Sequence, residues 1–433
     1  MCGIVGIYNL DKKKNIVDEL LTMMSKLQHR GKDSFGISYK GKNQIIPFKK
    51  KGMITGNIIT EIKEGKDIIS CVGHLKYRTS NMSGIHEDNI QPIIDGNISV
   101  SHNGNIPNVK GFDTQHILNE ILKYNGNFKD SLINLIKKIP AAYSLVIQSE
   151  DNLYLLKDRY GIRPLSYGFK GNNIYISSET IGLEGCNNIT EVDSGQILEI
   201  NNKSIHEIYK DNNAIDNICA FEFIYFMNPH SIYKNIIIQD VRKMLIKKLV
   251  ETEKKSFSKD YIVVGVPNSG IIYGEEYSRL LSLNYKQLIM KTTDERSFIS
   301  SNKEEIKKTC HKKFKYDKEK IKDNKIIVID DTIVRGNVMR YICKSLKECG
   351  AKEIHVRIPS PPIIDICQLG IPINNKRELL MLNNTNKETC SLLGIDSLLF
   401  LGKDILNELP FDTYRECFGG GIKEEIIAYL KQI

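Results

Sequence analysis

The feature that most constrains the fold is the stretch Lys325–Asn337, with the sequence KIIVIDDTIVRGN. It opens with consecutive β-branched residues and no polar alternation, which is typical of a strand buried on both faces of a parallel sheet. Two aspartates follow directly, then a short loop, and from Val338 onward apolar residues recur at helical spacing. The stretch therefore predicts a strand, an acidic loop and a helix N-terminus in an α/β domain.

Such an arrangement suits a sugar phosphate. Backbone N–H groups of the loop and the helix start can cradle a phosphate. Asp330 and Asp331 can accept ribose hydroxyls and help to hold a Mg²⁺ ion that carries a pyrophosphate. The alternative is a strand that ends in an acidic turn without a ligand. The apolar run before the aspartates and the IVRG loop after them favour the phosphate site.

The stretch resembles the phosphoribosylpyrophosphate (PRPP) loop of type I phosphoribosyltransferases, and its DDTIVRG form is similar to that of the amidophosphoribosyltransferase family. The resemblance implies that the backbone of the loop takes the 5-phosphate. The PRPP-binding residues that it implies here are Asp330, Asp331, Thr332, Ile333, Val334, Arg335, Gly336 and Asn337.

Two further segments extend this resemblance. The run Tyr261–Gly270 predicts a buried strand that leads into a Gly loop, where the family binds pyrophosphate; Ser269 matches the family's hydroxyl ligand of Mg²⁺, beside Asp330 and Asp331. The Lys-rich run 291–315 is by composition a solvated surface loop, but the resemblance implies a mobile loop that closes over PRPP with Lys291 and Arg296. Glu353–Ile358 is predicted to be the last strand.

The composition of the chain limits the number of domains, the kind of ligand and the cellular compartment that we expect. The chain has 433 residues, enough for two or three domains, and a net charge of +9 that is compatible with anionic small substrates. It has no Trp and no long lysine block, which argues against nucleic acid. No apolar run approaches the roughly 20 residues of a membrane span, and no signal peptide is evident. Ten cysteines without CxxC pairs indicate a reducing cytoplasm.

The N-terminal sequence MCGIVGIY places a cysteine directly after the initiator Met. Removal of Met1 would leave Cys2 with a thiol and a free α-amine on one residue, and the amine could act as general base for the thiol. The alternative is that Cys2 is simply a small residue at the start of a buried strand. Asn103-Gly104 offers a side-chain N–H and a closely approaching backbone N–H, which suits an oxyanion hole, although Asn-Gly most often forms a hairpin turn.

Several segments of the first half are together similar to the glutaminase domain of class II glutamine amidotransferases. They are MCGIVGIY, QHRGKDSFG, GHLKYRT, Gln91-Pro92, HNGN and DRYGIRPL. The resemblance implies that Cys2 attacks the side-chain amide of glutamine and that Asn103 and Gly104 stabilise the oxyanion. It also implies that Lys76 and Arg78 bind the α-carboxylate of glutamine and that Asp113 binds its α-amine. Lys76 stands where the family usually has Arg, so it keeps the charge without the two-pronged guanidinium.

The predicted architecture has two parts. Residues 2–210 are expected to form a glutamine amidotransferase type 2 domain with the α+β N-terminal-nucleophile hydrolase fold in four αββα layers. Residues 216–433 are expected to form an α/β type I phosphoribosyltransferase domain with a mostly parallel sheet. The boundary is placed in the polar, turn-rich stretch Asn201–Asn217. After it, Phe221–Phe226 and Pro229–Ser231 resemble the family's linker into the transferase domain.

Three cysteines, Cys219, Cys367 and Cys417, stand where one branch of the family has iron–sulfur ligands. The fourth position is Tyr414, whereas a [4Fe–4S] cubane takes four thiolates. The alternatives are an unusual cluster site or three buried thiols without a metal.

The predicted function is the glutamine-dependent transfer of ammonia to PRPP, which yields 5-phosphoribosylamine, glutamate and diphosphate in the first step of purine biosynthesis. Expected partners are glutamine, PRPP with Mg²⁺, purine nucleotides as feedback inhibitors, and further copies of the chain in a dimer or tetramer. Two alternatives remain at this point: a diverged paralogue with another amine donor or acceptor, and a PRPP-binding regulator without activity.

Overall fold

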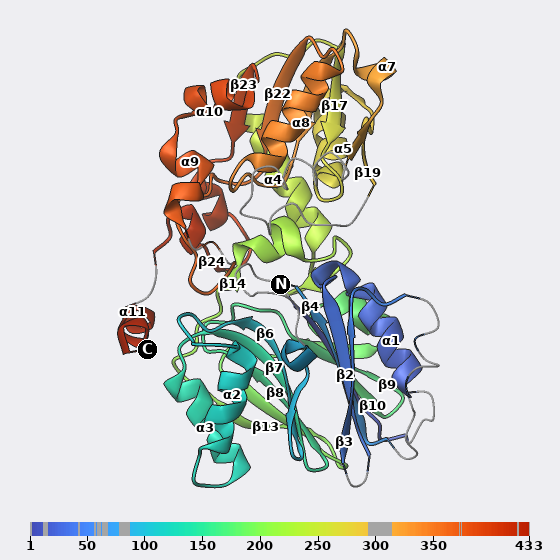
Figure 1. Ribbon diagram of the computed structural model, residues 1–433, viewed down its shortest axis with the longest axis vertical. Coiled ribbons are helices and arrows are strands. Elements are labelled where there is room, and N and C mark those ends of the chain that lie inside the picture. Colours follow the sequence, from blue (N-terminus) through green and yellow to red (C-terminus); the bar gives the residue numbers. More distant parts are fainter. Residues whose placement is uncertain are drawn as a thin grey trace.

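The computed structural model describes residues 2–11, 16–41, 44–55, 58, 62, 68–77, 87–292, 314–371, 373, 375–421 and 424–432. The chain forms two lobes, with the N-terminal end of the chain at the junction between them (Figure 1). None of the helices in these ranges is long and apolar enough to cross a bilayer.

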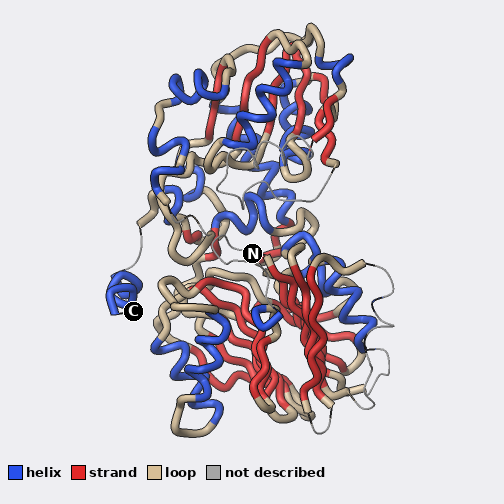
Figure 2. The backbone as a smooth tube through the Cα atoms, viewed as in Figure 1, coloured by secondary structure: helices blue, strands red, loops and turns tan. Residues whose placement is uncertain are grey.

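The first lobe contains two large antiparallel sheets (Figure 2). The seven-stranded sheet has the order β11 (Asn187–Glu191), β9 (Ser166–Lys170), β10 (Asn173–Ser177), β1 (Gly3–Tyr8), β4 (Ser70–Lys76), β2 (Ser34–Lys40) and β3 (Ile45–Lys51). The six-stranded sheet has the order β13 (Ile205–Lys210), β12 (Gln196–Ile200), β8 (Asn152–Lys157), β7 (Ala142–Ser149), β6 (Ile98–Asn105) and β5 (Ile93–Asp95).

The two sheets stack on each other and are covered by helices on their outer faces, because alternate side chains of each strand are apolar on both faces. In β1, Val5 and Ile7 pack in the cluster beneath α1 (Ile16–Lys26), whereas Ile4 and Tyr8 pack against residues of the other sheet, such as Val146. The outer face of the second sheet is covered by α2 (Asp113–Leu122) and α3 (Phe128–Lys138). Because successive side chains of a strand point to opposite faces, each sheet contributes to two cores. The four αββα layers predicted from the sequence are confirmed.

The second lobe is built on a five-stranded parallel sheet with the order β18 (Asn284–Tyr285), β17 (Tyr261–Gly265), β21 (Lys325–Ile329), β22 (Glu353–Ile358) and β23 (Ser397–Phe400). One face packs on α4 (Ile238–Thr252) and α5 (Gly270–Leu281). The other packs on α7 (Lys318–Ile321), α8 (Asn337–Glu348) and α10 (Asn386–Leu393). The prediction that Glu353–Ile358 is the last strand is wrong, because β23 pairs with it at the sheet edge.

Shorter elements complete the chain. They are the pairs β14 (Ile218–Cys219) with β24 (Thr413–Tyr414), β15 (Ile232–Tyr233) with β16 (Ile236–Ile237), and β19 (Ile289–Lys291) with β20 (Phe314–Tyr316); the helices α9 (Leu380–Asn383) and α11 (Glu424–Gln432); a π-helical turn at Glu222–Phe226; and 3₁₀ turns at Gln28–Arg30, Glu87–Asn89, Thr180–Leu183, Lys376–Glu378, Lys403–Asn407 and Glu416–Phe418.

The two lobes share polar and apolar contacts. The segment before the second lobe runs along the loop after β8, where the amides of Asn217 and Cys219 donate to the carbonyls of Tyr160 and Ile162 at 2.8 and 3.1 Å. A single apolar cluster extends from α2 and α3 through this segment to α4 and α5. At the chain's other end α11 returns to the first lobe, where Arg159 pairs with Glu425 at 3.3 Å.

Candidate active site

Cys2 directly precedes β1, in the middle of the seven-stranded sheet and at the junction of the lobes. Both of its main-chain polar groups are held by side chains. Its N–H donates to Oδ1 of Asn103 at 3.2 Å, and its carbonyl accepts from Nε of Arg30 at 2.8 Å. With the main chain fixed at both ends, the half-buried thiol has its side-chain rotation as its main freedom.

Asn103 and Gly104 lie within β6 and not in a hairpin turn. The strand continues past Val100 because residues 98–105 pair with β7 along its whole length, with Asn103 opposite Ser144 and Gly104 opposite Tyr143. The hairpin alternative for Asn-Gly is therefore wrong. A side chain at position 104 would meet the carbonyl oxygen of Ala142 at 1.9 Å, so only glycine fits there.

The side-chain amide of Asn103 has an unusual donor. Its oxygen accepts a hydrogen bond from the N–H of Cys2, but its Nδ2 is buried and has no hydrogen-bond partner among the described residues. Leaving a buried donor unpaired costs about 1–3 kcal/mol. A preorganised donor of this kind is the group that an oxyanion hole uses, so the oxyanion-hole role predicted for Asn103 stays a prediction that this geometry allows.

The predicted glutamine-binding residues are partly brought together. Lys76 ends β4, where its ammonium donates to the carbonyl of Asn89 at 2.6 Å and lies 4.2 Å from the ring centroid of Phe112. Burial lowers the pKa of Lys76, while the nearby Cys2 and Asp113 oppose that shift. Asp113 is the first residue of α2. Arg78 lies outside the described residues.

His102 and Asp113 form a buried pair beside this site. Nδ1 of His102 lies 3.5 Å from Oδ2 of Asp113 and 3.4 Å from the hydroxyl of Thr114. Burial alone would lower the pKa of His102, but the Asp113 carboxylate outweighs it and raises that pKa. The same contact lowers the pKa of Asp113 against the opposing effect of burial. His102 thus has a hydrogen-bonded partner and holds the start of α2.

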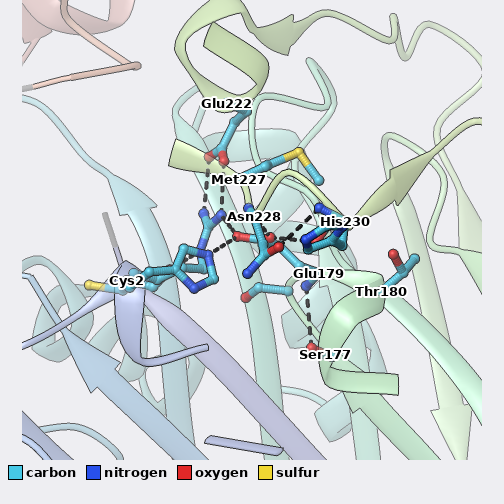
Figure 3. A network of polar contacts seen from close by, with 12 residues as sticks. Cys2, Ser177, Glu179, Thr180, Glu222, Met227, Asn228 and His230 are labelled. Atoms are coloured by element: carbon cyan, nitrogen blue, oxygen red, sulfur yellow. Dashed lines mark hydrogen bonds and ion pairs between the residues drawn. The ribbon is translucent and has the colours of Figure 1, made fainter. Parts of the chain in front are cut away.

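A buried ionic network, which sequence reasoning missed, joins Cys2 to the second lobe (Figure 3). Arg30 pairs with Glu179 at 2.5 Å and with Glu222 at 2.9 Å, and Arg163 reaches Glu222 at 3.1 Å; the side chains of all four are at most 1% exposed. Arg30, Arg163 and Glu179 lie in the HRG, GIRP and SSET motifs and Glu222 in the linker. The signal available in the sequence was a charged residue in each of these four segments, two of which, QHRGKDSFG and DRYGIRPL, are part of the family resemblance.

The acidic loop of the second lobe follows β21 at the carboxyl end of the parallel sheet, the usual place for ligands in such folds. Asp331 is buried, and its carboxylate accepts hydrogen bonds from the hydroxyls of Ser269 and Thr332, the latter at 2.7 Å. Burial raises the pKa of Asp331, and these two hydroxyl donors oppose the shift. Ser269 and Asp331, predicted as neighbours in one site, lie together.

In the rest of the loop, residues 333–337, the main chain and not the side chains is available for a ligand. Gly336 has a φ of 72° and precedes α8, whose first residue is Asn337. No side-chain hydrogen bond from Gly336 can cap this helix start, so its first N–H groups are left for another partner. Val334 is tied to α9 through its carbonyl, which accepts from the amide of Leu380 at 3.0 Å. Two side chains point away from the loop: Ile333 packs in the core, and Arg335 pairs with Glu378.

The predicted closing loop is described only at its base. Lys291 ends β19, which pairs with β20 in an antiparallel hairpin. Arg296 lies outside the described residues, as does the whole of 293–313.

The three cysteines converge at the lobe junction. A Cβ atom on Gly370 would lie 2.7 Å from Sγ of Cys367 and 3.2 Å from Sγ of Cys219, and Cys417 interacts with Cys367. Cys219 stands opposite Tyr414 across the β14–β24 pair, and the Tyr414 hydroxyl donates to Glu416. In the described part of the chain no group of three or more His, Cys, Asp or Glu side chains is arranged to hold a metal ion. Three thiols and the Tyr414 hydroxyl do not supply the four thiolates of a [4Fe–4S] cubane.

Comparisons with known proteins find relatives along nearly the whole chain. The model of the phosphoribosyl transferase domain family matches residues 230–358. The amidophosphoribosyltransferase of Methanothermobacter thermautotrophicus is 30% identical, with 94% of this chain and 90% of that protein covered. The Bacillus subtilis amidophosphoribosyltransferase is 29% identical over 92% of this chain and 87% of its own length.

Solved structures show the same fold over nearly the whole chain. The B. subtilis glutamine PRPP amidotransferase in complex with ADP and GMP aligns with a TM-score of 0.84 at 27% identity, covering 98% of each chain. A structure described as the allosteric regulatory enzyme of purine biosynthesis aligns with a TM-score of 0.83 at 26% identity, covering 99% of each.

Fold and site together define a glutamine amidotransferase joined to a phosphoribosyltransferase in one chain. The DDTIVRG loop and the N-terminal cysteine, taken together, already pointed to one kind of protein within this class. The chain belongs to the amidophosphoribosyltransferase family, and it is an enzyme of that kind.

Proposed function

We propose that this chain transfers nitrogen from glutamine to PRPP, in the first step of purine biosynthesis, with the site residues acting as follows. After removal of Met1, Sγ of Cys2 attacks the side-chain carbonyl carbon of glutamine. The oxyanion accepts hydrogen bonds from Nδ2 of Asn103 and the backbone N–H of Gly104. The α-amine of Cys2 takes the proton of the thiol and returns it to the leaving nitrogen as the C–N bond breaks, so that ammonia departs and a glutamyl thioester remains. Water then hydrolyses the thioester to glutamate.

Ammonia then reacts at the second site. It attacks C1 of PRPP as the bond from C1 to the pyrophosphate oxygen breaks, which yields 5-phosphoribosylamine and diphosphate. Asp330 and Asp331 accept the ribose hydroxyls, and the backbone of Thr332–Asn337, with the open N-terminus of α8, takes the 5-phosphate. Lys291 and Arg296 belong to the loop that we propose to close over PRPP.

Ser269, Asp330 and Asp331 would hold Mg²⁺, which would neutralise charge on the pyrophosphate. Hydroxyl and carboxylate oxygens are the ligands that this ion prefers, and the contact between Ser269 and Asp331 supports a shared site.

The observation that carries the proposal is the orphan donor of Asn103 beside Cys2. A buried N–H without a partner is rare in folded proteins, and here it lies on the residue whose other amide atom contacts the N–H of Cys2. Lys76 lies within electrostatic range of both Cys2 and Asp113, which supports Lys76 as the contact to the α-carboxylate of glutamine and Asp113 as the contact to its α-amine. Arg78 is proposed as a second contact to the α-carboxylate.

Two further parts of the proposal concern partners. The B. subtilis structure carries ADP and GMP, which supports purine nucleotides as feedback ligands of this chain too. Assembly into a homodimer or homotetramer in the cytoplasm is proposed from the resemblance to the family.

The test measures diphosphate release from PRPP and Mg²⁺ with either glutamine or free ammonia as nitrogen source. We expect activity with both in the wild type. Cys2→Ala should lose the glutamine-dependent activity and keep the ammonia-dependent one, and diazo-oxo-norleucine should label Cys2 in the processed wild type. Asp331→Asn should lose transfer to PRPP from either source and keep some glutaminase activity. Equal loss of both activities in either variant would contradict the two-site scheme.

A further inference from the structure

The orientation of Arg30 is set by a residue of the second lobe. Nη1 and Nη2 of Arg30 donate to the two carboxylate oxygens of Glu222 at 2.9 and 3.1 Å. A two-point contact of this kind fixes the plane of a guanidinium as well as its position. Since Nε of the same guanidinium donates to the carbonyl of Cys2 at 2.8 Å, the orientation imposed by Glu222 reaches the residue that bears the nucleophile.

Glu222 is itself anchored to the transferase lobe. It begins the π-helical turn Glu222–Phe226, which together with Met227 we call the linker segment. Arg242 of α4 donates to the carbonyls of Phe223 and Met227 at 2.8 and 2.7 Å, and Tyr273 of α5 donates to the carbonyl of Ile224 at 2.9 Å. Arg242 and Tyr273 also lie within electrostatic range of the Asp331 carboxylate.

Stability alone does not account for charges at this place. Arg30 and Arg163 balance Glu179 and Glu222, so the buried network is neutral, but a buried ion pair adds little stability over apolar residues of the same size. What such a network provides is a defined geometry with directional contacts. Its contact to Cys2 is the one that bears on the reaction.

We propose that the glutaminase site is incomplete without the linker segment: Glu222 is a positioning residue that sets the position of Cys2 through Arg30, and Arg242 holds the segment from the transferase side. The inference rests on the proposed function, because it assigns Cys2 as the nucleophile. It adds a residue outside the glutaminase lobe to the machinery that acts on glutamine.

The experiment uses the full chain and the variant Glu222→Gln, which keeps the shape of the side chain and removes its charge. Misplacing a reacting group by about 1 Å can cost on the order of 10²-fold in rate. We expect a loss of this size in the kcat of glutaminase with the KM for glutamine little changed, and a matching loss in the rate at which iodoacetamide alkylates Cys2. Diphosphate release with free ammonia should stay at the wild-type level.

Two more variants guard against a trivial loss of folding. Glu222→Asp keeps the carboxylate on a side chain that is shorter by one methylene, and its glutaminase kcat should lie between those of wild type and Glu222→Gln. Arg242→Lys keeps the charge near Asp331 but cannot hold both carbonyls, and should lower the glutaminase kcat less than Glu222→Gln while leaving ammonia-dependent activity intact. The matched control is Glu253→Gln, which removes a buried carboxylate from Arg357 within the transferase lobe and should leave glutaminase kcat unchanged.

The outcomes separate the two levels of the proposal. If wild type shows no glutaminase activity, the proposed function fails. If wild type is active and Glu222→Gln alkylates and turns over like wild type, or loses activity no more than Glu253→Gln does, the positioning role of Glu222 is refuted. A rise in KM alone would refute it as well, because that result indicates a binding contact.

Discussion

At the scale of single residues, two neighbouring positions of β6 differ from ordinary strand positions. Asn103 holds a buried donor without a partner among the described residues, and Gly104 fits because any larger residue would strike Ala142. An unpaired buried donor costs stability, but Asn173 has one too, so it is the contact of Asn103 with the N–H of Cys2 that supports our assignment of this donor to the oxyanion.

The variant Asn103→Asp tests whether the N–H donor of this side chain, and not merely its size, matters for glutaminase activity. The substitution keeps the size of the side chain and removes the N–H that we assign to the oxyanion, so glutaminase kcat should fall on the order of 10²–10³-fold. The control is Asn173→Asp. Asn173 is also fully buried, its Oδ1 accepts a hydrogen bond from the amide of Asp11 at 2.7 Å, and its Nδ2 has no hydrogen-bond partner among the described residues. Steady-state kinetics with glutamine should show the loss at position 103 only; equal losses in both variants would assign it to stability.

The pair of His102 and Asp113 makes a prediction about pH. Burial opposes the charged form, but Asp113 raises the pKa of His102 above its ordinary value of 6.5. A group whose pKa is raised by folding adds stability that is complete below its unfolded pKa and disappears as the pH rises through the folded pKa. Thermal midpoints of Asp113→Asn should therefore lie below wild type at pH 6, and the gap should narrow toward pH 9.

The control for this measurement is Glu120→Gln, which removes another carboxylate from α2. Glu120 is paired with the exposed Lys123 and not with a histidine. Its midpoints should run parallel to those of wild type over the same pH range. A gap for Asp113→Asn that is constant with pH would show that His102 does not titrate against Asp113.

At the scale of elements, the unit β21–loop–α8 places the transferase chemistry. Gly336 joins the acidic loop to the helix with a φ of 72°, and a Cβ there would lie 2.6 Å from Cδ2 of Leu380. In Gly336→Ala the left-handed conformation costs roughly 1–2 kcal/mol for an L-residue. We expect lower stability and a higher KM for PRPP in the ammonia-dependent assay, because the loop backbone must shift.

Gly350→Ala is the matched comparison at the other end of the same helix. Gly350 also has a positive φ, of 89°, but its nearest neighbour is the flexible side chain of Lys322 at 3.3 Å. It should lose stability for the same backbone reason and keep the wild-type KM for PRPP. If the two variants bind PRPP alike, the loop at Gly336 does not form the phosphate site.

The elements also show what a sequence can and cannot reveal. The strand, loop and helix of residues 325–348 follow from local patterns, since β-branched runs and helical spacing act over a few residues. The extension of β6 through Asn103 and Gly104 does not, because it depends on pairing with β7 some 40 residues away. The contact of Arg30 with Glu222 spans 192 residues, and no local period reports it.

At the scale of the whole molecule, the question is whether the lobes act as separate bodies. Domain interfaces within a chain usually permit motion unless they are large and apolar. Here one apolar cluster runs from α2 and α3 to α4 and α5, and the buried network of Arg30 and Glu222 crosses the same junction. The physical expectation is that neither lobe unfolds while the other stays intact.

Scanning calorimetry of the full chain should therefore show one transition. Ile162 belongs to the shared cluster and its carbonyl accepts from Cys219 of the second lobe at 3.1 Å, so Ile162→Ala weakens the junction itself. Loss of a buried Ile costs about 2–5 kcal/mol, and here it should broaden the transition or divide it in two. Ile37→Ala removes an equally buried side chain from the separate cluster beneath α1, and should lower the midpoint of a transition that stays single. Two transitions in the wild type, or identical profiles for the two variants, would show that the lobes are stabilised independently, and the linker segment could then shift without either lobe unfolding.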